Sequence, residues 1–197
     1  MTAYAESQES NLSLNTRKIV IAGILGAIAI LLAVTRWGFI PVPNFTGNAT
    51  ILHVPAILGG VLEGPVVGFL VGGIFGVFSF IQAEVPAFKD PLVAILPRLF
   101  IGIVAWLVFV GLRGTNVYVA AIIAGILGTL TNTVGVLGMA TIRGYFPADL
   151  ILTILPQVIM EVILAAIITA IVVKAVDLYR SGRTTAPEIA EGEERRY

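Results

Sequence analysis

Residues 50–76, TILHVPAILGGVLEGPVVGFLVGGIFG, decide the fold, because they comprise two apolar segments joined at Glu63-Gly64-Pro65. Glycine recurs at every fourth position of the second segment, at Gly64, Gly68, Gly72 and Gly76. This spacing places all four on one face of a helix. In water each glycine would cost roughly 1 kcal/mol of helix propensity, whereas in a membrane a face without side chains lets a neighbouring backbone approach closely. The stretch is therefore predicted to be a tightly packed helical hairpin in a membrane.

The composition of the whole chain agrees with a membrane location. Of its 197 residues, 57% are hydrophobic and 12% are charged, and the mean hydropathy is +0.98. These values exclude the class of soluble globular proteins. Several apolar runs reach about 20 residues, the length that crosses a hydrocarbon core of roughly 30 Å. The chain is thus predicted to be an all-α integral membrane protein with one compact domain in the lipid bilayer.

Other classes of site are excluded by what the sequence lacks. It contains no cysteine and a single histidine, so neither a disulfide framework nor a metal site of thiolates or clustered histidines is expected. The formal net charge is zero and no basic block accompanies exposed aromatic residues, which argues against a nucleic-acid partner. No cofactor site is expected.

The apolar pattern predicts a bundle of six transmembrane helices, at residues 19–34, 51–62, 65–81, 91–112, 116–140 and 150–173. The second helix is only a dozen residues long, or roughly 18 Å. It is either tilted and extended by the preceding loop, or re-entrant, and we take the tilted, spanning version. Polar tails at 1–14 and 177–197 flank a membrane domain at 15–176, and we assign no structure to the tails.

Lysine and arginine are unevenly distributed between the two ends of the predicted bundle. One end holds six of them and the other end three. The richer end has Arg17, Lys18, Arg113, Lys174, Arg180 and Arg183, and the poorer end has Arg36, Lys89 and Arg143. Because cytoplasmic loops carry the excess of basic residues, both termini are predicted to be cytoplasmic.

The loop at residues 36–49 combines two prolines and two glycines with Trp37, Phe39 and Phe45. It is too irregular for a spanning helix. Aromatic side chains can anchor a protein at the membrane surface, or they can stack on and cover a ligand. Their clustering favours an extracellular lid over a binding site.

Two charged residues fall deep inside predicted helices. Arg98 lies about eight residues into its helix, on the order of 12 Å by helix rise, and Glu161 lies deeper in the last one. A charge at such depth costs at least about 2.5 kcal/mol, so it normally faces a partner or a wet cavity. The two residues could form an ion pair with each other. Alternatively, the planar guanidinium of Arg98 could bind a carboxylate or phosphate of a ligand.

Polar residues at a similar depth occur in the last two helices. Thr129, Thr131, Asn132 and Thr133 lie in one, and Gln157 lies in the other. They could line an outward-facing pocket, with Asn132 as the main ligand contact. The alternative is that the threonines bond to their own helix or hold helices together.

His53 follows the aromatic loop at the outer end of the second helix. A lone histidine there is more often a hydrogen-bonded structural residue than a ligand contact, although its pKa near neutrality also suits a proton-coupled role.

The first helix carries pairs of small residues four positions apart, a spacing that lets helices approach closely. The pairs are Ala22 with Gly26, Gly23 with Ala27, and Ala29 with Ala33. They could pack within the bundle. However, they form more small faces than one neighbour requires, so one face could dock another protein.

In order along the chain, TILHVPAILGGVLEGPVVGFLVGGIFG, PRLFIGIVAWLVF and GTLTNTVGVLGM resemble the substrate-binding S components of energy-coupling factor vitamin transporters, especially the pantothenate and cobalamin type. The resemblance covers roughly residues 18–175. It implies a protein of the prokaryotic plasma membrane that captures a water-soluble vitamin beneath its first extracellular loop. The implied partners are a transmembrane coupling subunit and two ATP-binding subunits. The implied docking signature, two alanines four apart, matches Ala29 with Ala33 and, with glycine substituted, Ala22 with Gly26 and Gly23 with Ala27.

Three functional hypotheses follow from the residues and the resemblance. The preferred one is a substrate-capture subunit that binds pantothenate, or secondly cobalamin, and is not itself an enzyme because its partners hydrolyse ATP. An autonomous proton-coupled carrier using Glu161 and His53 is the alternative, although no inverted repeat of the kind many carriers use is visible. An intramembrane enzyme is the third, for which the sequence offers neither a nucleophile nor metal ligands.

Overall fold

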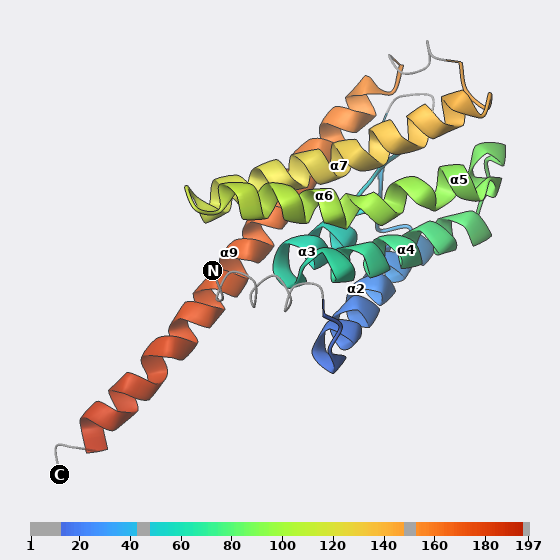
Figure 1. Cartoon of the computed structure of the whole chain (residues 1–197). Coiled ribbons are helices and arrows are strands. Elements are labelled where there is room, and N and C mark those ends of the chain that lie inside the picture. Colours follow the sequence, from blue (N-terminus) through green and yellow to red (C-terminus); the bar gives the residue numbers. More distant parts are fainter. Residues whose placement is uncertain (1–12, 43–47, 148–152, 195–197) are drawn as a thin grey trace, which may run out of the picture.

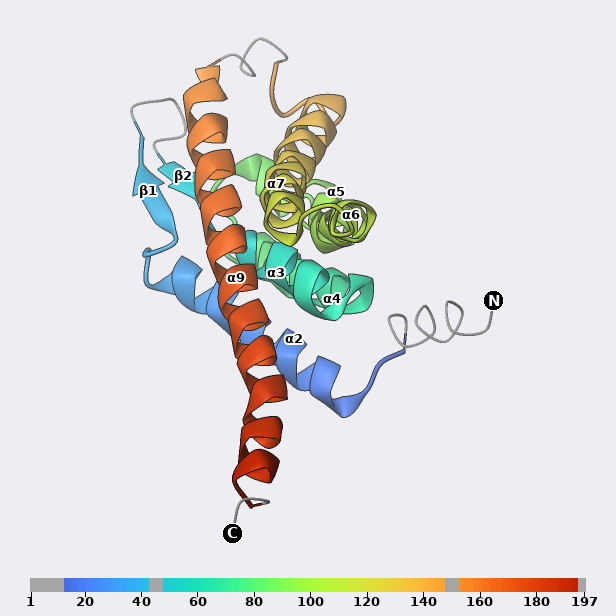
Figure 2. The same cartoon turned by 90° about the vertical axis from the view of Figure 1, so that its left-hand side faces the viewer.

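The computed structural model describes residues 13–42, 48–147 and 153–194. It is a bundle of helices with a short β-hairpin on one side (Figures 1 and 2). In chain order the elements are α2 (Thr16–Val34), β1 (Phe39–Pro41), β2 (Asn48–Thr50), α3 (Val54–Glu63), α4 (Pro65–Ile81), the 3₁₀ helix η1 (Pro86–Lys89), α5 (Pro91–Ala94), α6 (Leu96–Leu112), α7 (Val117–Ile142) and α9 (Leu155–Glu194). The helices α4, α6 and α7 pack in succession across the bundle (Figure 1).

Each of the six predicted segments contains a helix, but within the described part of the chain only four are long and apolar enough to cross a membrane. These four are Thr16–Val34, Pro91–Leu112, Val117–Ile142 and Leu155–Tyr179. The shorter apolar helices α3 and α4 have 10 and 17 residues. The second of these long segments, Pro91–Leu112, is interrupted at Ile95, between α5 and α6. Pro97 explains the break, because proline has no N–H to continue the hydrogen bonds of a helix.

Local signals fix several helix ends. The side chain of Asn15 accepts a hydrogen bond from the N–H of Lys18 at the start of α2, and Asn116 accepts from Tyr118 and Val119 at the start of α7. Such caps satisfy N–H groups that have no partner inside the helix. Between α3 and α4 the chain reverses at Gly64, where φ is 104°. This conformation is readily adopted by glycine alone. The predicted turn of the helical hairpin, between α3 and α4, therefore lies at the residue type that it requires.

The predicted packing role of the glycine series is confirmed. The α3, α4 and α6 helices meet where Gly60, Gly68 and Gly102 face one another. A methyl group built on Gly68 would lie 2.7 Å from the Cα of Gly102 and 2.9 Å from the Cα of Gly60. Further along α4, Gly72 lies against the backbone carbonyl of Arg98. Backbone therefore packs directly on backbone through the centre of the bundle.

Two segments contain regular structure that the sequence analysis did not predict. In the aromatic loop, which forms no spanning helix in its described part, β1 and β2 pair antiparallel with Phe39 opposite Thr50 and Pro41 opposite Asn48. This pairing satisfies backbone groups in a segment that leaves the bundle. The polar segment 177–194, to which we assigned no structure, continues α9 to Glu194 and projects beyond the other helices (Figures 1 and 2). Extending an existing helix is far less costly than nucleating a new one.

Candidate functional site

The carboxylate of Glu161 attaches the hairpin to α9 (Figure 2 shows the hairpin beside this helix). Glu161 is 3% exposed. Its Oε1 accepts hydrogen bonds from the Thr50 backbone N–H at 2.8 Å and from Nε2 of Gln157 at 3.0 Å, and it lies 3.3 Å from the Thr50 hydroxyl. Neutral donors thus surround this charge. Among the described residues, Glu161 forms no ion pair with Arg98, so the predicted alternative of such a pair is wrong.

Arg98 is held by aromatic rings instead of by a carboxylate. It is 5% exposed, and its guanidinium carbon lies 4.7 Å from the ring centre of Phe75 and 5.2 Å from that of Phe88. Nη1 donates to the carbonyl of Ala94, whereas Nε has no hydrogen-bond partner among the described residues. Cation–π contacts stabilise a desolvated guanidinium without neutralising it. Arg98 therefore keeps its charge and an unused N–H donor inside the bundle.

The hydrogen bonds of His53 determine which of its ring nitrogens carries the proton. His53 is fully buried, and its Nε2 lies 3.0 Å from the hydroxyl of Thr129. That hydroxyl donates its only proton to the carbonyl of Gly125, at 2.8 Å. It must therefore accept from His53, which places the proton on Nε2 and leaves Nδ1 as an acceptor. Nδ1 has no partner in the part of the chain that the structure describes.

Two more buried polar atoms without described partners lie one turn along α7. They are Oδ1 of Asn132 and Oγ1 of Thr133. Because these residues follow Thr129 by three and four positions, they share its face of the helix. Thr131 points elsewhere, and its hydroxyl donates to the carbonyl of Leu127 at 2.7 Å. For Thr131 and Thr129 the structure therefore has the back-bonding that we gave as the alternative.

These buried atoms differ in the hydrogen bonds that they can still form. His53 Nδ1 and Asn132 Oδ1 are acceptors, Arg98 Nε is a donor, and the Thr133 hydroxyl can act as either. Buried polar atoms without partners are rare in folded proteins, and each costs about 1–3 kcal/mol. A ligand that carries hydroxyl, amide and anionic groups would satisfy them.

The aromatic residues predicted for the lid differ in their environment. Trp37 is 83% exposed, whereas Phe39 packs on the edge of the main core. Phe45 lies outside the described residues. The sequence analysis missed Thr50, Phe75 and Phe88 as neighbours of the predicted residues. No spacing links Thr50 to Glu161 or Phe88 to Arg98, so no sequence signal could have identified them.

The small residues of α2 divide between two faces. Ala22, Gly26 and Ala29 are buried against the bundle, where Gly26 contacts the side chain of Ile74. Ala33 is half-buried and also packs on the core. By contrast, Gly23 and Ala27 are exposed, and no atom lies within 4 Å of a methyl group built on Gly23. Of the three predicted pairs, only Gly23 with Ala27 opens outward.

A charged cluster joins two loops at the hairpin end of the bundle. Asp90 Oδ2 accepts a hydrogen bond from Nε of Arg143 at 2.7 Å, and the Tyr145 hydroxyl lies 3.4 Å from the same oxygen. The other carboxylate oxygen caps α5 through the N–H of Leu92. The bond from Arg143 is the main reason that the pKa of Asp90 is lowered from its ordinary value. The cluster thus fixes the start of α5 to the end of α7.

Comparison with known proteins places this architecture in a family. The family model described as "ECF transporter, substrate-specific component" matches residues 17–176. The chain belongs to this family. It is therefore the substrate-binding S component of a membrane transporter, and its four long apolar helices agree with a multi-pass location in the membrane.

The chain is also similar to two individual proteins. It is 26% identical over 189 residues to the pantothenic acid transporter PanT of Lactococcus lactis subsp. cremoris (strain MG1363), with 83% of this chain and 95% of PanT covered. It is also similar to a solved structure described as the S component of a bacterial ECF transporter, with 17% identity and a TM-score of 0.60. That match covers 83% of this chain and 96% of the solved chain, and it shows the same fold.

Proposed function

We propose that this S component captures pantothenate from outside the cell and delivers it to an ATP-driven importer. The observation that carries the proposal is the set of buried polar atoms on Arg98, His53, Asn132 and Thr133 that have no hydrogen-bond partner among the described residues. Similarity to a protein named as a pantothenic acid transporter supports the same substrate. Cobalamin is the second candidate, by the resemblance described above.

The groups of pantothenate complement these atoms one by one. Its carboxylate suits the guanidinium of Arg98, because charge-assisted hydrogen bonds are stronger than hydrogen bonds between neutral groups. Its hydroxyl groups can donate to His53 Nδ1, and its amide can bond to Asn132 of α7. Thr133 of α7 and Gln157 of α9 offer further polar groups. A site with buried polar groups rejects ligands that leave them unpaired. Selectivity would therefore come from donors and acceptors rather than from shape alone.

The hairpin is the proposed cover of this site. It follows α2, and Glu161 binds its second strand to α9 at the level of Gln157. In this proposal α3 and α4 complete a set of six membrane crossings, both termini are cytoplasmic, and Trp37 and Phe39 face the ligand or the outer membrane surface. The ligand would enter when the β-hairpin separates from α9.

The proposed partners are a transmembrane coupling subunit and two ATP-binding subunits. Because Ala22, Gly26 and Ala29 are occupied within the bundle, the outward pair Gly23 and Ala27 is the face available on α2 for the coupling subunit. Small residues there would let a partner helix approach closely.

Uptake of labelled vitamins tests this function. The chain would be expressed with and without coupling and ATP-binding subunits, and uptake of labelled pantothenate and cobalamin would be measured before and after ATP depletion. The proposal expects concentrative pantothenate uptake only with the partners and only with ATP. Concentrative uptake by the chain alone, insensitive to ATP depletion, would instead indicate an autonomous carrier that uses Glu161 and His53.

A further inference from the structure

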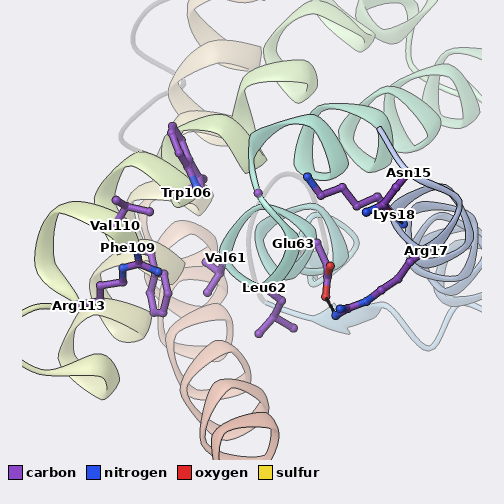
Figure 3. Close-up of a pocket in the computed structure, with 11 residues that line it drawn as sticks. Asn15, Arg17, Lys18, Val61, Leu62, Glu63, Trp106, Phe109, Val110 and Arg113 are labelled. Atoms are coloured by element: carbon purple, nitrogen blue, oxygen red, sulfur yellow. Dashed lines mark hydrogen bonds and ion pairs between the residues drawn. The ribbon is translucent and has the colours of Figure 1, made fainter. Parts of the chain in front are cut away.

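A cavity lies at the end of the bundle opposite the β-hairpin. It has a volume of about 380 Å³ and is formed where α2 begins and where α3 and α6 end (Figure 3). The residues that determine its chemistry are Arg17, Lys18, Glu63, Trp106, Phe109 and Arg113. We refer to this cavity, which has these six residues in its lining, as the basic recess. None of them belongs to the site described above.

The recess carries more positive than negative charge. Three of its side chains are cationic, and Glu63 is the carboxylate among them. Glu63 Oε1 forms an ion pair with Nη2 of Arg17 at 2.7 Å. Lys18 is 7% exposed, and its Nζ donates to the carbonyl of Ser13 at 2.9 Å. Among the described residues that line the recess, three cations outnumber one carboxylate, so the formal charge of this lining favours an anion.

Figure 3 shows how the charges are distributed around the recess. Arg113 lies on one side beside Phe109 of α6, and Arg17 and Lys18 lie on the other side, on α2, with Glu63 between them. Arg113 is exposed, and in the described part of the chain no ion pair includes it. A group that carries negative charge on several oxygens could contact both sides at once.

The remaining walls are apolar, and this feature indicates the class of ligand. Trp106 and Phe109 precede Arg113 along α6 and line the recess. Outside the recess, the same helix has Leu107 55% exposed and Leu112 37% exposed. The recess lies where the candidate membrane segment Thr16–Val34 begins and where the segment Pro91–Leu112 ends. Basic and aromatic side chains at that depth meet lipid headgroups. A free anion would use the basic side chains but would gain nothing from the apolar walls.

We propose that the basic recess binds the phosphate group of an anionic phospholipid such as phosphatidylglycerol. The phosphate lies between Arg113 and the basic residues of α2, and the glycerol and upper acyl chains lie along Trp106 and Phe109. This proposal is independent of which substrate the S component transports.

Native mass spectrometry of the full chain tests the proposal. The protein would be titrated in mixed micelles with phosphatidylglycerol and, separately, with phosphatidylcholine. Arg113→Gln removes one cation from the recess, whereas Lys174→Gln removes one exposed cation from α9 outside it. We expect preferential retention of phosphatidylglycerol, weakened roughly fivefold by Arg113→Gln, the effect of about one basic residue near an anionic surface, and unchanged by Lys174→Gln. Substrate binding by both variants would show that they are folded.

Four results would overturn the proposal. The first is equal retention of the two lipids, and the second is an equal effect of the two variants. The third is displacement of phosphatidylglycerol by millimolar inorganic phosphate, which would make the recess a site for soluble anions. If neither lipid is retained while Arg113→Gln weakens assembly with the coupling subunit, an acidic group of that partner occupies the recess and the lipid proposal fails.

Discussion

Oε1 of Glu161 accepts a hydrogen bond from the backbone N–H of Thr50 at 2.8 Å, which joins two residues 111 positions apart in the chain. The bond closes the hairpin against α9, next to the residues proposed to recognise the substrate. A hydrogen bond to a charged group contributes about 1.5–3 kcal/mol. One carboxylate thus controls how firmly the proposed cover is held.

The first prediction concerns this bond. Glu161→Ala leaves the Thr50 N–H without its acceptor, so we expect the amide hydrogens of residues 48–50 to exchange at least about tenfold faster, in line with the loss of one charged hydrogen bond. Hydrogen exchange followed by mass spectrometry measures this directly. Glu84→Ala, which removes an exposed carboxylate paired with Arg36, is the control. Unchanged exchange in Glu161→Ala would mean that strand pairing alone holds the hairpin.

Arg98 provides the second prediction. Arg98→Gln should weaken pantothenate binding by at least roughly thirtyfold, since removal of one partner from a buried, hydrogen-bonded charge pair costs about 2 kcal/mol or more. Arg98→Lys should restore little, because an ammonium cannot reproduce the planar contacts with Phe75 and Phe88. Isothermal titration with the purified variants would measure both affinities, with Lys174→Gln as a matched loss of charge. Full affinity in a folded Arg98→Gln protein would assign Arg98 a purely structural role.

The glycine contacts give the third prediction. Gly68→Ala should lower the free energy of unfolding by about 1–3 kcal/mol, the usual cost of overpacking, because its new methyl group would meet the backbone of Gly102. Gly23→Ala meets no atom within 4 Å and should be neutral or stabilising by up to about 1 kcal/mol through helix propensity. Thermal unfolding followed by size-exclusion chromatography distinguishes the two. Equal melting temperatures would contradict the close packing.

A fourth prediction separates the two faces of α2. Ala27→Leu adds bulk on the outward face and should leave substrate binding intact while it weakens assembly with the coupling subunit. Ala29→Leu adds the same bulk where the native side chain is 1% exposed and should destabilise the S component itself. Co-purification with the coupling subunit and thermal stability, measured for both variants, would test this. Normal assembly by Ala27→Leu would exclude this face as the docking site.

The fifth prediction concerns pH. Because Arg143 lowers the pKa of Asp90 in the folded protein, ionised Asp90 stabilises the fold above its unfolded pKa of about 3.9. This contribution is lost as the pH falls through the lower, folded pKa. Asp90→Asn keeps a side chain able to cap α5 but loses the ion pair. It should therefore melt at a lower temperature than the wild type near neutral pH, and the difference should shrink in acid. A difference independent of pH would exclude the ion pair as its source.

The sequence predicted helix positions and packing faces better than it predicted partners. Glycines four apart identified the face of α4 that meets α6, and the depth of Arg98 and Glu161 identified two residues that are buried. Periodicity carries no information about which distant segment covers a face. The bond from Thr50 to Glu161, the rings around Arg98 and the basic recess all depend on topology, so none was predicted. The helical course of residues 177–194 was missed because their polar composition suggested a tail, whereas the preceding apolar helix provides the nucleus.

The meeting of Gly60, Gly68 and Gly102 has a mechanical consequence. Dispersion contacts weaken within an ångström of separation, so α3, α4 and α6 cannot slide past one another gradually without losing their attraction. These helices behave as one stationary wall. Under the proposed function, the movement that admits a substrate falls on the β-hairpin, whose second strand is joined to α9 by the bond from Thr50 to Glu161. A substitution that stiffens the wall should then leave the rate of substrate entry unchanged.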